Sequence, residues 1–119
     1  DQFREGIVLV QGFDLCIVAY AKAEWTKMAE RMAALPPTRA NYRRLNRSFF
    51  GGSHEGELDR QGRVILPQVL RSYAHIGSGA VIVGVNSYLE IWSAELWAQE
   101  KATAEAQSWQ IAETIEVRS

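Results

Sequence analysis

The chain has 119 residues and a mass of 13.4 kDa, with 47% hydrophobic and 23% charged residues, which is typical of one globular domain or two small subdomains. No apolar run approaches the roughly 18 residues that a membrane span requires. The single cysteine, Cys16, has no partner for an internal disulfide. These features exclude the fibrous, disordered and disulfide-rich classes and predict a soluble protein of a reducing compartment.

The charge is unevenly distributed along the chain, although the net charge is only −1. Residues 1–38 carry −1, residues 39–75 carry +4 and residues 76–119 carry −4, and all seven basic residues of the central segment are arginines. The planar donor group of arginine suits phosphates and guanine edges. The central segment therefore indicates either an anionic partner or a solvated helix face that pairs with the acidic C-terminal part.

The first predicted elements are strands over 7–10 and 16–20, separated by a turn around Gly12, and a helix over about 22–34. That helix presents one apolar face and ends at Pro36. The residues that define the face are Trp25, Met28, Met32 and Leu35.

A second helix follows, with Thr38 as its expected N-cap and Gly51-Gly52 at its end. Its apolar stripe consists of Tyr42, Leu45 and Phe49. Arg39, Arg43 and Arg47 form a separate basic stripe at i, i+4 and i+8.

The next segment predicts a hairpin, with strands over 55–58 and 64–66 and a turn over 59–63. Gly62 supplies the positive φ that such a turn requires, and Asp59 can accept backbone N–H bonds within it. A short helical stretch over 68–73 follows the hairpin.

The last elements are strands over 80–85 and 88–92, joined at Asn86-Ser87, and a helix with Ser93 as its N-cap. Trp97 is the clearest apolar anchor of that helix. Its continuation is rich in alanine and weakly amphipathic, so we expect a loosely docked tail.

A repeat with an offset of 72 residues relates the first hairpin and helix to the last ones. The matched pairs include Leu9 with Val81, Val10 with Ile82, Ile17 with Leu89, Tyr20 with Trp92, and Trp25 with Trp97. The central hairpin lies before the second copy. We therefore expect a matching hairpin upstream of Asp1, where the printed sequence begins.

The stretch from Glu57 to Pro67 resembles the swapped-hairpin element of the AbrB-like superfamily, with an Asp-x-x-x-Arg turn formed by Asp59 and Arg63. Together with the repeat, the Phe49-Phe50-Gly51-Gly52 helix end and Glu90-Ile91-Trp92, the chain resembles the MraZ family. The resemblance implies an α+β fold of two pseudo-repeated AbrB-like swapped-hairpin β-barrel halves with linking and flanking helices. We place these halves at residues 1–50 and 51–119.

The same resemblance implies a sequence-specific DNA-binding transcriptional repressor. Such a protein binds double-stranded DNA at repeated promoter boxes of the division and cell-wall gene cluster. It also implies a ring-shaped homo-oligomer that lies in the cytoplasm, associated with the nucleoid. A ring would align several weak DNA contacts and raise their effective concentration on repeated boxes.

The expected DNA-binding residues are Arg60, Gln61 and Arg63, because a two-stranded ribbon enters the major groove and presents its turn to phosphates and bases. Asp59 and Gly62 are expected to shape the turn. Judged from the residues alone, a structural ion pair is the commoner role for Asp59 and Arg63, and the DNA role follows from the resemblance. Arg39, Arg43 and Arg47 are expected to form a solvated face or a contact between subunits, and to add at most a diffuse electrostatic contribution to DNA binding.

The alternative function is an oligomeric protein-interaction module of the antitoxin-like swapped-hairpin type, whose partner docks on the acidic C-terminal helix. An enzyme is not expected, because Cys16 lies among apolar residues, and His54 and His75 are isolated in the sequence. We expect no cofactor, no metal and no small-molecule substrate.

Overall fold

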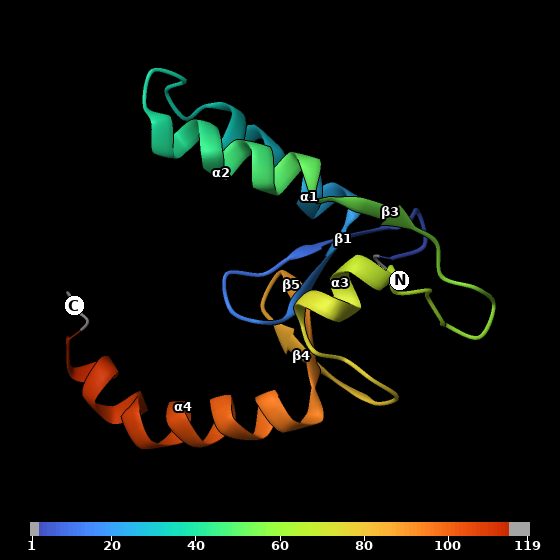
Figure 1. Ribbon diagram of the computed structural model, residues 1–119, viewed down its shortest axis with the longest axis vertical. Helices are drawn as coiled ribbons and strands as arrows, with labels where there is room; N and C mark the ends of the chain where they lie inside the picture. The colour runs from blue at the N-terminus through green and yellow to red at the C-terminus, as the bar shows by residue number, and fades with distance from the viewer. Residues whose placement is uncertain (1–2, 115–119) are drawn as a thin grey trace.

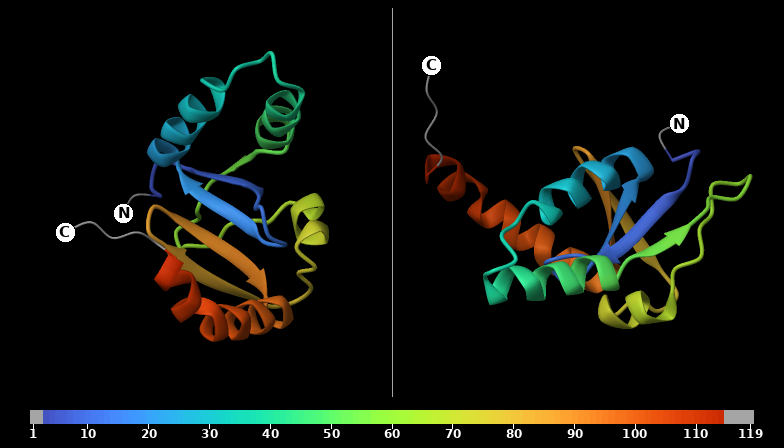
Figure 2. Two further views of the ribbon diagram at one scale, coloured as in Figure 1. Left: turned by 90° about the vertical axis from the view of Figure 1, so that its left-hand side faces the viewer. Right: turned by 90° about the horizontal axis from the view of Figure 1, so that it is seen from above.

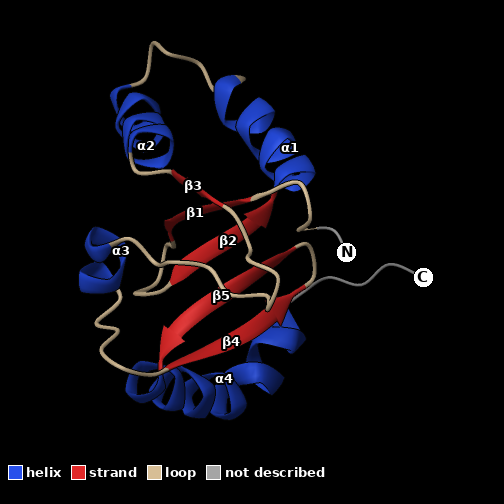
Figure 3. Cartoon of the chain, turned by 90° about the vertical axis from the view of Figure 1, so that its right-hand side faces the viewer, coloured by secondary structure: helices blue, strands red, loops and turns tan. Residues whose placement is uncertain are grey.

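The computed structural model describes residues 3–114, whose strands form one antiparallel sheet covered by helices (Figures 1 and 3). The sheet has the strand order β3-β1-β2-β5-β4. The strands are β1 (Ile7–Gln11), β2 (Ile17–Ala21), β3 (His54–Gly56), β4 (Ala80–Val85) and β5 (Tyr88–Ser93). The helices are α1 (Lys22–Ala33), α2 (Ala40–Gly51), α3 (Gln68–Tyr73) and α4 (Ala94–Thr114). The predicted α+β class is confirmed, and none of the helices within residues 3–114 has the length and apolarity needed to cross a bilayer.

Both copies of the repeat form hairpins, and the two hairpins lie side by side in the sheet. The β1–β2 ladder runs from Ile7↔Ala21 to Gln11↔Ile17, and the β4–β5 ladder runs from Ala80↔Ser93 to Val85↔Tyr88. Antiparallel pairing of β2 with β5 joins them. Asn86 has a φ of +50°, as expected for its hairpin turn.

Alternating side chains of β1 and β2 fill two apolar clusters, one on each face of the sheet. On one face, Leu9 and Ile17 pack with Leu70 of α3. On the other face, Val10 and Tyr20 pack with Trp25 of α1 and with residues of α4. Because helices cover both faces, β1 and β2 are buried almost throughout.

The helices α1 and α2 form an arm that projects from the sheet. The ring of Trp25 stacks on that of Phe49 with centroids 4.7 Å apart, and Phe50 meets Phe49 edge-on at 5.3 Å. The left view of Figure 2 shows this arm and α4 at opposite edges of the sheet.

The predicted N-cap of α2 is wrong by one residue. The N-cap is Arg39, which has an extended backbone and makes no side-chain capping bond. The Arg39 N–H is 3.4 Å from the carbonyl oxygen of Pro36, so Thr38 lies inside a turn and does not start the helix. The N-cap of α4 is confirmed, because the Ser93 hydroxyl accepts the backbone N–H of Leu96 at 3.1 Å.

The predicted central hairpin is also corrected. Residues 57–66 form a loop that has no assigned strand, and β3 covers only the three residues before it. Two backbone bonds close its turn, from the Asp59 N–H to the Arg63 carbonyl oxygen at 2.8 Å and from the Gly62 N–H to the Asp59 carbonyl oxygen at 3.0 Å. The β1–β3 ladder stops at Ile7↔Gly56 because the preceding Gly6 has a φ of +126° and turns the chain away from β3.

Candidate nucleic-acid interface

The loop of residues 57–66 carries a tight turn that is organised by one carboxylate. Oδ1 of Asp59 accepts the backbone N–H groups of Gln61 at 2.9 Å and of Arg63 at 2.8 Å. Oδ2 of Asp59 accepts the Nε–H of Arg63 at 2.8 Å. The Gly62 N–H donates to the Asp59 carbonyl oxygen at 3.0 Å, and Gly62 has a φ of +78°. Asp59 therefore uses its side chain to hold the backbone of the turn.

These bonds also change the titration of Asp59. The backbone N–H of Arg63, followed by its side-chain Nε–H, lowers the pKa of the Asp59 carboxyl from its ordinary value of 3.8. The carboxyl is consequently anionic at neutral pH. Its charge is directed into the turn, which reduces the repulsion that a free carboxylate would exert on a phosphate.

The basic side chains of the turn are presented to solvent. The side chain of Arg63 is 73% exposed, although its Nε donates to Asp59, so its two Nη groups remain as further donors. Arg60 and Gln61 are also exposed, and both lie at the tip of the loop. In Figure 1 this loop is the yellow-green segment that extends beyond β3, away from α4.

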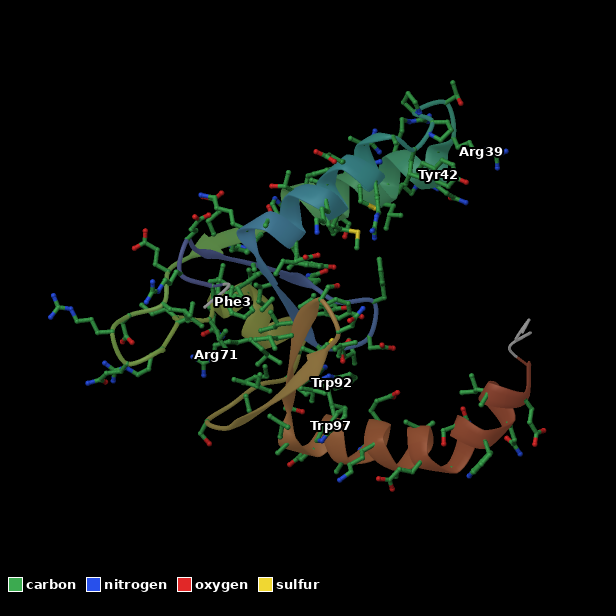
Figure 4. The ribbon with its side chains drawn as sticks, turned by 180° about the vertical axis from the view of Figure 1, so that it is seen from behind. Phe3, Arg39, Tyr42, Arg71, Trp92 and Trp97 are labelled. Carbon is green, nitrogen blue, oxygen red and sulfur yellow. The ribbon has the colours of Figure 1, made fainter. Side chains whose placement is uncertain are left out.

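The arginines of α2 are separated from this turn. Arg39 lies over the ring of Tyr42, 5.7 Å from its centroid, and Nη1 of Arg43 donates to the carbonyl oxygen of Pro37 at 2.8 Å. Figure 4 labels Arg39 and Tyr42 at the far end of the arm. The structure therefore places Arg39, Arg43 and Arg47 in a different region from Arg60 and Arg63.

Arg71 is a basic residue near the turn that the site prediction did not include. It lines a shallow pocket with Ile65 and Leu66, which follow the turn, and its Nη2 donates to the Gly77 carbonyl oxygen at 2.8 Å. Figure 4 shows Arg71 on the side of the molecule that carries the loop. The feature of the sequence that could have indicated Arg71 is its position four residues after Pro67, just downstream of the predicted hairpin.

The structure gives no nucleophilic character to Cys16. Its side chain is 1% exposed, and burial, followed by the charge of Glu90, raises the pKa of its thiol to about 12. The thiol is therefore protonated at neutral pH, and thiols in this form react slowly. Among the described side chains, no group of three or more His, Cys, Asp or Glu residues could hold a metal ion.

Comparison with known proteins relates most of the chain to one family. A family model described as "MraZ protein, putative antitoxin-like" matches residues 49–118. The protein named Transcriptional regulator MraZ from Desulforamulus reducens is 42% identical over 118 residues, which cover 96% of this chain and 83% of that protein. Its namesake from Dehalococcoides mccartyi is 41% identical over 114 residues, which cover 95% and 80%. A third, from Desulfitobacterium hafniense, is 44% identical over 108 residues, which cover 87% and 76%. With this identity along most of its length, the chain belongs to the MraZ family.

Proposed function

We propose that this chain is a sequence-specific DNA-binding transcriptional repressor whose Asp59–Arg63 turn reads the major groove. The observation that carries the proposal is that different residues of the turn hold its backbone and face the solvent. Asp59 holds the backbone, and Arg60, Gln61 and Arg63 remain exposed beside it. The printed name of the relatives, transcriptional regulator, supports the same role.

The chemistry of the turn suits a DNA edge. Arginine donates to phosphate oxygens and, in bidentate form, to the O6 and N7 atoms of guanine, and glutamine pairs with adenine. The hydrogen bonds that Arg63 donates to the Asp59 carboxylate hold its side chain in one geometry before DNA arrives, which lowers the entropy lost on binding. Arg71 is a candidate for an additional phosphate contact on the same side of the molecule.

One such turn supplies few contacts with DNA, so we propose that several copies of the chain act together. Several copies in a ring-shaped homo-oligomer would bind repeated promoter boxes of the division and cell-wall gene cluster through a raised effective concentration. The internal repeat extends the proposal to the fold, as two swapped-hairpin barrel halves at residues 1–50 and 51–119, of which residues 1–2 and 115–119 lie outside the described part. We place this activity in the cytoplasm, at the nucleoid.

The test is fluorescence anisotropy of a labelled duplex with tandem promoter boxes, against a scrambled duplex, at two salt concentrations. Arg60→Ala/Arg63→Ala should weaken binding to the boxes roughly tenfold or more and flatten the salt dependence. The matched control is Arg31→Ala/Arg44→Ala, which removes the same charge from exposed positions on the arm. If both variants bind alike, the turn is not the reader and the proposal fails.

One observation favours the alternative of a protein-interaction module: α4 is exposed from Lys101 to Glu113. Truncation after Ala98 removes this surface and leaves the turn intact. If the alternative is correct, the truncation should abolish partner capture, whereas Arg60→Ala/Arg63→Ala should have no effect on it.

A further inference from the structure

A pocket lies between α1 and α2, the two helices that Figure 3 shows side by side on the arm. Its volume is about 450 Å³, which falls within the usual range for small-molecule sites. One wall comes from the end of α1 and the loop after it, and the other wall is a single face of α2, with lining residues at i, i+3, i+4 and i+7. The lining residues are Ala33, Leu35 and Pro37 on the first wall and Arg43, Asn46, Arg47 and Phe50 on the second.

The apolar part of the pocket has a fixed shape. Phe50 is 38% exposed, but its ring meets Phe49 edge-on at 5.3 Å and Trp25 edge-on at 6.1 Å. Leu35, on the opposite wall, is half-buried. The pocket therefore presents preformed apolar surface on both sides, which suits a flat apolar ring.

The pocket also carries positive charge that the arm itself does not neutralise. Residues 33–51 contain four arginines and no acidic residue. Nη1 of Arg43 donates to the carbonyl oxygen of Pro37 at 2.8 Å, which ties one wall to the other and leaves the guanidinium charge unpaired. Within residues 3–114, the side chain of Arg47 has neither an ion pair nor a hydrogen bond. Two guanidinium groups one helical turn apart favour a carboxylate.

Asn46 adds a requirement for a hydrogen-bond donor. Its Nδ2 donates to the carbonyl oxygen of Tyr42 at 3.0 Å, which fixes the orientation of the amide. Its Oδ1 is buried and accepts no hydrogen bond from any described group. Buried acceptors are rarely left unsatisfied, so an N–H or O–H group entering the pocket would gain a bond that the chain does not supply.

We propose that this pocket binds a small organic acid that combines an apolar ring, a carboxylate and an N–H donor. The ring lies between Leu35 and Phe50, the carboxylate pairs with Arg43 and Arg47, and the N–H donates to Oδ1 of Asn46. The Asp59–Arg63 turn takes no part, so this second site goes beyond the proposed DNA-binding function.

Other anionic ligands fit fewer of these features. Inorganic phosphate or a nucleic acid backbone would pair with the arginines, but it would leave the apolar walls exposed and carries no N–H for Asn46. A fatty acid would cover the apolar walls and pair with the arginines, but its hydrocarbon chain has no donor. Only an acid with both a ring and a donor meets all three requirements.

The experiment is an NMR titration of the isotope-labelled full chain with indole-3-propionate, which has the ring, the carboxylate and the N–H. The side-chain amide signal of Asn46 and the methyl signal of Ala33 should shift and saturate, with a dissociation constant of about 1 mM or below. The amide signals of Gln61 and Arg63 should not move. Indole-3-propanol, which lacks the charge, should bind roughly tenfold more weakly, and 1-methylindole-3-propionate, which lacks the donor, several-fold more weakly.

Matched variants assign these losses to residues of the pocket. Arg47→Gln should weaken binding of indole-3-propionate roughly tenfold. Arg44→Gln is its control, because it removes the same charge from an exposed position on α2 that does not line the pocket, and it should bind the probe as the parent does.

Asn46→Leu tests the donor directly. The variant should bind indole-3-propionate and its 1-methyl derivative with equal affinity, because the acceptor that distinguishes them is gone. Urea denaturation of each variant verifies that the arm remains folded. A general loss of structure would weaken both ligands and would not by itself remove the difference between them.

Three results would each overturn the inference. The first is the absence of a saturable shift at Asn46 and Ala33. The second is equal binding by Arg47→Gln and Arg44→Gln. The third is inorganic phosphate shifting the same signals at the same concentration as indole-3-propionate, which would show an unspecific anion site. Arg60→Ala/Arg63→Ala should bind the probe as the parent does, so the pocket and the DNA-binding turn stand or fail separately.

Discussion

The two copies of the internal repeat share a pattern in sequence but differ in burial. The first copy, β1–β2 with α1, occupies the centre of the sheet, between β3 and β5. The second copy, β4–β5 with α4, includes the edge strand β4, whose residues alternate between exposed and half-buried. Val10 is 3% exposed, whereas its repeat equivalent Ile82 is 65% exposed. Equivalent positions of the repeat therefore do not contribute equally to the free energy of folding, because the neighbouring strands decide how much apolar surface each position buries.

The helices of the two copies also differ in how far they are covered by other elements. Helix α1 is covered by α2, and Trp25 stacks on Phe49 of that partner. Helix α4 has no such partner in the described chain, and only its first turns pack on the sheet, through Leu96 and Trp97. The outer turns of α4, residues 101–113, are consequently exposed to solvent.

The largest expected effect on stability comes from replacing isoleucine with alanine at one position in each copy of the repeat. Ile17 is 0% exposed and Ile82 is 65% exposed. Ile17→Ala should lower the free energy of unfolding by about 2–5 kcal/mol, because it leaves a cavity in the core. Ile82→Ala should change it by about 0.5 kcal/mol or less. Urea denaturation measures both, and equal losses would show that the copies are equally buried.

A smaller effect concerns how the two helices begin. Ser93 caps α4 with its hydroxyl, whereas the equivalent Ala21 begins α1 with no side-chain cap. Ser93→Ala should cost about 1 kcal/mol, because the Leu96 N–H loses its acceptor. Thr38→Ala is the control, since Thr38 does not cap α2, and it should leave the urea midpoint unchanged. A loss as large for Thr38→Ala would contradict the assigned start of α2.

The smallest effect on global stability is expected at the Asp59 turn, which lies outside the sheet. The pKa of Asp59 is lowered in the folded turn, so its stabilising contribution is present above the ordinary value of 3.8. That contribution is lost as the pH falls through the lowered folded value. The amide chemical shifts of Gln61 and Arg63, followed by NMR, should therefore show a midpoint below 3.8.

Asp59→Asn provides the matched control for this titration. The amide oxygen can still accept both backbone N–H groups, but the variant does not titrate and has no anionic partner for Arg63. The two amide shifts should then be flat with pH, the urea midpoint should change little because the turn lies outside the sheet, and box binding should weaken several-fold. A midpoint at or above 3.8 in the parent would contradict the geometry of the turn.

Local patterns predicted most elements of the fold because local chemistry forms them. Asn86 accepts a positive φ, Ser93 carries a hydroxyl that can cap a helix, and the α3 segment has the predicted bounds, 68–73. The arms of the central hairpin were mispredicted because a strand also needs a neighbour. Glu57 and Leu58 alternate suitably, but Gly6 ends β1 beside them.

The candidate site also has features that the sequence predicted and features that it did not. The Asp-x-x-x-Arg spacing predicts a carboxylate-closed turn, because a side chain four residues away is within reach of its own loop. The role of Arg71 was not predictable from spacing, since its place depends on α3 folding back toward the turn. The pocket between α1 and α2 could not be predicted either, because its lining residues Leu35, Asn46 and Phe50 meet only when the two helices pack together.

The sequence by itself determined the turn chemistry, the helix and hairpin positions, the repeat and the family, because each of these depends on residues close together in the chain or on matched patterns. Only the tertiary structure decided which copy of the repeat is buried, that residues 57–66 leave the sheet, and that the α2 arginines lie apart from the turn. It also left Oδ1 of Asn46 buried without a hydrogen-bond partner among the described residues, and Trp109 79% exposed. The physical reason is that burial and hydrogen-bond satisfaction are set by neighbours in space, which a local pattern does not specify.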